Sequence, residues 1–62
     1  MTIQEAEKMV CEGLGIGDIS GLRDLCVTEE MYMETETIVI EGLVHDAGFT
    51  YKQAEKIWLN WV

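Results

Sequence analysis

The chain has 62 residues, with twelve acidic side chains against four basic ones and a formal net charge of −8. A chain this short is expected to form a single helical domain, residues 1–62, and to bury only ~60% of the surface that its unfolded form exposes. The negative charge repels phosphates and anionic headgroups, which disfavours nucleic-acid and membrane-surface binding, and no apolar run approaches the roughly 18 residues of a membrane span.

The first predicted element is a helix over residues 3–13. Thr2 and Glu5 have the spacing of a capping box, in which each side chain satisfies the backbone N–H of the other residue. Apolar side chains then recur at helical spacing at Ile3, Ala6, Met9, Val10 and Leu14. Three glycines, Gly13, Gly15 and Gly17, end the helix.

The second predicted element is a short helix over about residues 19–27. Asp18 or Ser20 is placed to cap it, and Leu22, Leu25 and Cys26 would point inward. No strand precedes the Gly-Ile-Gly that leads into this segment, so it does not indicate a nucleotide-binding loop.

The stretch from Glu29 to Glu41, EEMYMETETIVIE, fits two structures. Its β-branched run favours a strand, but no other segment is predicted to be a strand, so another chain would have to complete it. As a helix it would begin after a capping Thr28, with acidic residues at its positive end, and would end before Gly48. We expect a helix over residues 29–47, about 28 Å long, with the strand as the alternative.

The predicted helix 29–47 is apolar around more than half of its circumference. Glu30, Glu34 and Glu41 form one narrow stripe. One broad apolar face carries Met31, Thr35, Ile38, Val39, Gly42 and Leu43, and a second carries Met33, Ile40, Val44 and Ala47. Since a helix exposed on one side needs an apolar arc of only about 100°, we expect this helix to be central, with its glutamate stripe in water. Glu36 lies between the apolar faces, and should reach the rim or meet a base, which could be Lys52, Lys56 or one on a partner.

The last predicted helix starts with a second capping box, formed by Thr50 and Gln53. Ala54, Ile57, Trp58 and Trp61 follow at the i, i+3, i+4 and i+7 positions of one face. We expect Trp58 in the core. For Trp61 two roles stay open, core residue and binding anchor, because only one residue follows it and tryptophan is enriched in binding hot spots.

The segment from Gly42 to Trp58, GLVHDAGFTYKQAEKIW, resembles the helix–loop–helix of ubiquitin-associated domains. Those domains carry a methionine–glycine–phenylalanine loop, which reads Ala47-Gly48-Phe49 here, followed by a helix with alanine roughly where Ala54 stands. The resemblance covers about a quarter of the chain and implies a tight helix–helix corner. The methionine that the family uses for its ligand is replaced by Ala47.

Few residues are suited to catalysis or metal binding. The only histidine, His45, adjoins Asp46, but neighbouring helical residues do not face each other, and a histidine near a helix C-terminus interacts favourably with the dipole. Serine occurs once, at Ser20, and Cys11, Cys26 and His45 lack the spacing of metal ligands. We therefore expect no enzymatic activity, no metal and no cofactor.

The N-terminal sequence and the two cysteines are considered together, because the cellular compartment determines whether cysteines form disulfides. The first ten residues have neither the basic nor the apolar region of a signal peptide, so we expect a reducing, cytoplasmic location. Cys11 and Cys26 are then expected to be small core residues. The alternative is a Cys11–Cys26 disulfide, which would close a loop of about 16 residues and contribute about 3 kcal/mol.

These features predict an all-α fold, a small bundle of three to four helices around a central helix at about 29–47. The functional hypothesis is a small acidic protein–protein interaction module, in its most concrete form a phage or mobile-element inhibitor that covers a basic surface of a host protein. Its predicted partner-binding residues are Glu30, Glu34, Glu36, Glu41, Met31, Tyr32, Met33 and Trp61. The glutamates would steer association by charge complementarity, and the other four residues would anchor it.

Two alternative functions would bury the surplus apolar residues of the chain in different ways. Tyr32, Met33, Ile40, Leu59 and Val62 are expected to exceed what a monomer of this size covers. A self-associating structural subunit, for example a homodimer, would bury them against a second copy. A peptide-binding helical adaptor, the function that the resemblance implies, would bind its ligand in a groove between helices.

Overall fold

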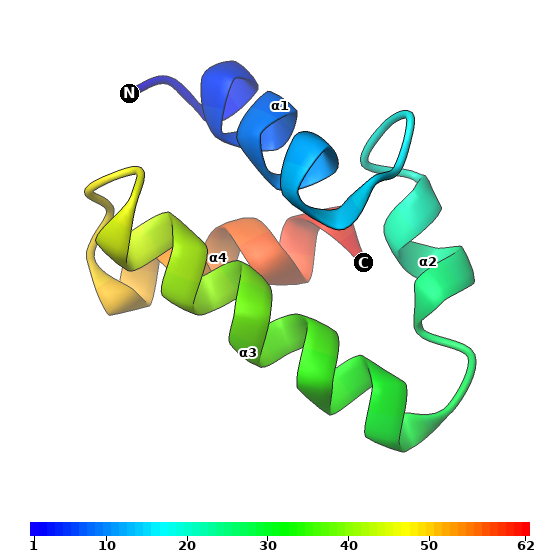
Figure 1. Cartoon of the computed structure of the whole chain (residues 1–62). Helices are drawn as coiled ribbons and strands as arrows, with labels where there is room; N and C mark the ends of the chain where they lie inside the picture. Colours follow the sequence, from blue (N-terminus) through cyan, green and yellow to red (C-terminus); the bar gives the residue numbers. More distant parts are fainter.

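A computed structural model describes residues 1–62 as four helices with no strand (Figure 1). In chain order these are α1 (Ile3–Leu14), α2 (Gly21–Leu25), α3 (Glu29–His45) and α4 (Tyr51–Trp61). The all-α prediction is confirmed, and the stretch from Glu29 to Glu41 is helix rather than strand. α3 is the central element, because α1, α2 and α4 all pack against it.

Threonine side chains begin three of the four helices. The hydroxyl of Thr2 accepts a hydrogen bond from the backbone N–H of Glu5 at 3.1 Å, and the Glu5 carboxylate accepts from the backbone N–H of Thr2. Thr50 and Gln53 form the same reciprocal pair at the start of α4. Thr28 accepts from the backbone N–H three residues on, at the start of α3. These bonds satisfy donors that have no partner within the helix, and they place the three starts where the sequence predicted them.

Glycines in the left-handed conformation end α1 and turn the chain after α3. Gly15 has φ 71° and ends α1 one residue later than predicted. Gly48 has φ 78°, and the N–H of Phe49 then donates to the carbonyl of Leu43 at 3.1 Å. Both φ values are readily available only to glycine. The tight α3–α4 corner is thus confirmed, although α3 ends at His45 and not at residue 47.

α2 is shorter than predicted, covering residues 21–25 instead of about 19–27. Ser20 stands at its N-terminus but makes no capping bond, because its backbone is helical (φ −62°, ψ −22°) and not extended as an N-cap requires. Its hydroxyl donates to the Asp18 carboxylate instead. That hydrogen bond holds the pKa of Asp18 below its usual range. Leu22 is fully buried as expected, whereas Leu25 and Cys26 are only half-buried at the edge of the core.

The core lies between α3 and the three helices that cover it. Its buried residues are Ala6, Val10, Leu22, Val39, Ile40, Leu43, Ala54, Ile57, Trp58 and Trp61. The radius of gyration, 10.5 Å, matches the value of about 10.6 Å expected for a domain of this length. The accessible surface of 4314 Å² is close to the ~4,000 Å² typical of a monomeric protein of this mass. The chain thus reaches normal compactness by itself. None of its helices combines the length and the apolar character needed to cross a membrane.

Candidate protein-interaction surface

The side of α3 that faces away from the core carries both acidic and apolar side chains. Glu30, Glu34 and Glu41 are exposed and lie in one stripe along the helix, as predicted. Met31 and Ile38 border the stripe on one side, and Met33 borders it on the other. α3 contains no lysine or arginine. We call these six residues the α3 outer face.

The apolar residues of the α3 outer face are substantially exposed. The exposed fraction is 61% for Met33 and 58% for Ile38, and Met31 is also exposed. The helical wheel correctly placed Val39 and Leu43 in the core, but its assignment of Met31 and Ile38 to the same inward face is wrong. The part of the α3 circumference that is buried is narrower than the part that carries apolar residues, because α1 and α2 cover only some of this side of α3.

Tyr32, one of the predicted partner-binding residues, links α3 to α4. Its ring is half-buried and packs edge-to-face on Trp58, with ring centroids 5.3 Å apart and an angle of 63° between the planes. The indole N–H of Trp58 donates to the Tyr32 hydroxyl at 3.1 Å. The bond gives a buried indole its polar partner and fixes the tyrosine hydroxyl. Tyr32 therefore serves the fold.

Trp61 belongs to the core. Only 6% of its surface is exposed, and it joins Trp58, Ala54 and Ile57 in one buried cluster. The structure thus decides between the two roles left open by the sequence, and Trp61 offers a partner no anchoring surface. Ile40, predicted to be part of the uncovered apolar excess, is buried as well.

Glu36 reaches the rim, which is the first of its two predicted positions. It is half-buried and lines a shallow groove between α3 and α4 with Ile40, Glu55, Trp58 and Leu59. No base lines this groove, so the expected meeting with Lys52 or Lys56 does not occur there. Glu36 is therefore marginal to the α3 outer face.

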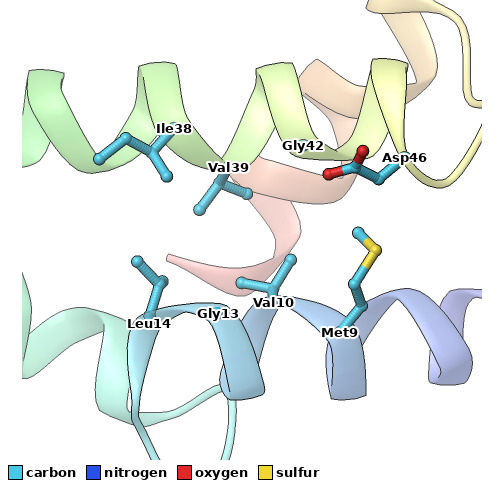
Figure 2. A pocket seen from close by; sticks show the side chains of 8 residues that line it. All are labelled: Met9, Val10, Gly13, Leu14, Ile38, Val39, Gly42 and Asp46. Carbon is cyan, nitrogen blue, oxygen red and sulfur yellow. The ribbon is translucent and has the colours of Figure 1, made fainter.

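A second feature adjoins the α3 outer face, a groove between α1 and α3 with a volume of about 240 Å³ (Figure 2). It is lined by Met9, Val10, Gly13 and Leu14 of α1, by Ile38, Val39 and Gly42 of α3, and by Asp46. In Figure 2 the side chains of the two helices face each other across it, and the Asp46 carboxylate lies at the same end as Met9. We call it the α1–α3 groove. The sequence did not predict it, because it depends on how two helices cross.

The thiols and the histidine form no further site. Both cysteines are free, Cys11 buried and Cys26 half-buried. Burial raises the pKa of the Cys11 thiol, and the nearby carboxylates of Asp18, Glu7 and Glu12 act in the same direction, so the reactive thiolate is disfavoured. His45 is exposed in the last turn of α3. No three side chains of histidine, cysteine or acid lie close enough to hold a metal ion.

Comparisons with known proteins give no family for this chain: no family model, no curated protein and no solved structure matches it. The resemblance to ubiquitin-associated domains, carried by residues 42–58, covers the α3–α4 corner. A functional proposal has to be built on the α3 outer face and the α1–α3 groove themselves.

Proposed function

We propose that this protein is a non-catalytic interaction module whose α3 outer face docks onto a basic surface of a protein partner. The supporting observation is the composition of that face, on which three exposed carboxylates stand between exposed methionine and isoleucine side chains, with no lysine or arginine on the helix. Carboxylates in this arrangement steer and orient a basic partner. The apolar side chains between them supply the contact area that excludes water.

The inner side of α3 already provides the core contacts of the monomer, so the fold does not account for apolar residues on the outer side. Ile38 and Met33 keep more than half of their surface exposed, which leaves that apolar surface available to a partner. In its most concrete form, the module is a stoichiometric inhibitor that covers a functional basic surface. It would act in a reducing compartment, where Cys11 and Cys26 remain thiols.

The test is charge reversal on the stripe. A tagged full-length chain carrying Glu30→Lys and Glu34→Lys is compared with the wild type in capture from cell extract, at low and at high salt. The matched control is Asp24→Lys with Glu55→Lys, because it changes the net charge equally at exposed positions on α2 and α4. We expect the stripe variant to lose a captured protein by about tenfold or more and the control to keep it.

Circular dichroism of both double variants checks that the helices remain. If the two charge reversals weaken capture equally, binding follows net charge and the α3 outer face is not the site. If the stripe reversal leaves capture unchanged, the glutamates serve solubility alone.

Sedimentation equilibrium over a concentration series, with and without thiol reductant, tests the alternative of self-association. We expect a monomer, because two copies would bring like charges together. A reductant-independent dimer that dissociates in the Ile38→Glu variant would favour the assembly subunit instead.

A further inference from the structure

We propose that the α1–α3 groove seats the apolar side chains of a cationic amphipathic helix presented by the protein partner. This inference rests on the proposed function and adds to it the type of partner element and the place where it binds. It is carried by the shape of the groove, by its glycines and by the charges along its two rims.

The groove is apolar and open to solvent. Ile38 is mostly exposed at its edge, and Met9 and Leu14 are half-buried along its wall. Its volume of about 240 Å³ exceeds the roughly 150 Å³ of an apolar protein cavity that accommodates benzene. A leucine- or phenylalanine-sized side chain therefore has room to enter between α1 and α3.

Two glycines keep the groove open. A Cβ atom added to Gly13 or to Gly42 would meet no atom within 4 Å, so neither glycine is required for the packing of α1 against α3. Both belong to helices, in which glycine is the least favourable residue except proline. A larger residue at Gly42 would both favour the helix and fill the groove. Its absence leaves an apolar hollow that an incoming side chain could fill.

Acidic side chains border the groove on both rims. Met9 on α1 and Ile38 on α3 each have a glutamate four residues before and another three residues after them, positions that are neighbours on a helix surface. These exposed glutamates are Glu5 and Glu12 on α1, and Glu34 and Glu41 on α3. Asp46 adds a carboxylate at one end. Lys8, the only lysine or arginine on either helix, lines a different groove with Cys11 and the loop before α2, and Glu12 lines that groove as well.

This charge pattern selects among possible occupants. A second copy of the chain would bring its own charge of −8 against the acidic rims. A neutral small ligand would leave the carboxylates unused. An amphipathic helix with an apolar stripe flanked by lysine or arginine would place its apolar side chains in the groove and its basic side chains beside the carboxylates. This is the helix-in-groove mode of recognition.

The test uses a synthetic helical peptide of leucine and lysine in amphipathic order, and a second peptide in which glutamate replaces lysine. Each is titrated calorimetrically into the full-length protein at low and at physiological salt. Gly42→Leu fills the groove, and Gly17→Leu is the matched control, because Gly17 also has open space around it but lies outside the groove. We expect Gly42→Leu to weaken binding of the lysine peptide about tenfold or more, and Gly17→Leu to bind like the wild type.

Two further readouts localise the binding. The largest amide chemical-shift changes on adding the lysine peptide are expected at Gly13 and Gly42, and the glutamate peptide is expected not to bind. Wild-type affinity in Gly42→Leu, or shift changes confined to α4, would overturn the inference. So would equal binding of the glutamate peptide, since charge would then not select the occupant, or a wild-type dimer that Gly42→Leu abolishes.

The result also separates this inference from the proposed function. If charge reversal at Glu30 and Glu34 removes the captured partner but Gly42→Leu keeps it, the α3 outer face is the site and the groove is not. If neither variant affects the partner, both proposals fail.

Discussion

α4 and α3 are built on different patterns. α4 has one buried face, formed by Ala54, Ile57, Trp58 and Trp61, and most of its other side chains are polar. α3 buries Val39 and Leu43 yet leaves apolar residues exposed on its opposite side. α4 leaves one aliphatic side chain, Leu59, mostly exposed, whereas α3 leaves Met31, Met33 and Ile38 exposed. Folding alone therefore explains more of α4 than of α3, and the outer half of α3 is the part that the proposed partner would cover.

The largest expected effect is that of Trp58→Ala, which removes the centre of the α4 face. Trp58 is the largest fully buried side chain, and such a truncation costs about 3–5 kcal/mol. A domain of this size has a comparable total stability, so we expect a largely unfolded chain in far-UV circular dichroism and urea titration. Leu59→Ala, on the exposed side of the same helix, should change stability by no more than about 0.5 kcal/mol. Cooperative unfolding of Trp58→Ala near the wild-type midpoint would contradict this account of α4.

Tyr32→Phe tests the link between the two helices. The substitution keeps the edge-to-face contact but leaves the indole N–H of Trp58 without its acceptor. We expect a loss of about 1–2 kcal/mol in the free energy of unfolding, measured by urea titration. Tyr51→Phe is the control, because Tyr51 is exposed and removing its hydroxyl should have almost no effect. Equal midpoints for the two variants would show that the Tyr32 hydroxyl contributes nothing to stability.

Gly42→Ala probes the α1–α3 groove and should stabilise the protein. Alanine fits without a clash and favours the helix, so we expect a gain of about 0.5–1 kcal/mol and a higher melting temperature. Gly48→Ala should have the opposite sign, because φ at Gly48 is positive. A loss of stability in Gly42→Ala would mean that α1 and α3 pack more tightly than the groove implies.

The smallest effect concerns the capping boxes of α1 and α4, which differ in one respect. The backbone N–H and hydroxyl of Thr2 lower the pKa of Glu5, whereas Gln53 in the α4 box does not titrate. Because the folded-state pKa of Glu5 is the lower one, its contribution is present above the ordinary pKa of glutamate and is lost as the pH falls through the lowered value. Amide exchange should show the start of α1 fraying in acid while α4 stays protected. In Glu5→Gln this pH dependence should disappear, and its persistence would assign the fraying to another group.

Local features of this molecule could be predicted, because the signals that produce them lie within a few residues. The capping boxes at Thr2 and Thr50 and the turn at Gly48 are examples. The start of α2 was predicted less well. Ser20 has the residue type of a cap, but its backbone is helical and not extended, so its hydroxyl accepts no hydrogen bond from the first turn of α2.

Features that depend on which helices meet could not be predicted. Trp61 is followed by Val62, yet it belongs to the same buried cluster as residues of α1, α2 and α3. Ile38 has the right angle on the helix to be buried, but α1 covers α3 incompletely beside it. A helical wheel gives the direction of a side chain and not the presence of a neighbour. The α1–α3 groove was missed for the same reason.

The α3–α4 corner has a consequence for the lifetime of the protein. It joins α3 and α4, the two helices that pack most extensively against each other, through a short turn, and chains with such local helical contacts fold in microseconds to milliseconds. The chain contains no proline, so no slow isomerisation delays refolding. If the unfolded chain refolds faster than a protease cleaves it, the rate of proteolysis depends on the equilibrium fraction of unfolded molecules and not on the rate of unfolding. A bound partner lowers that population by mass action, so occupancy of the binding surface would set how long each molecule survives proteolysis.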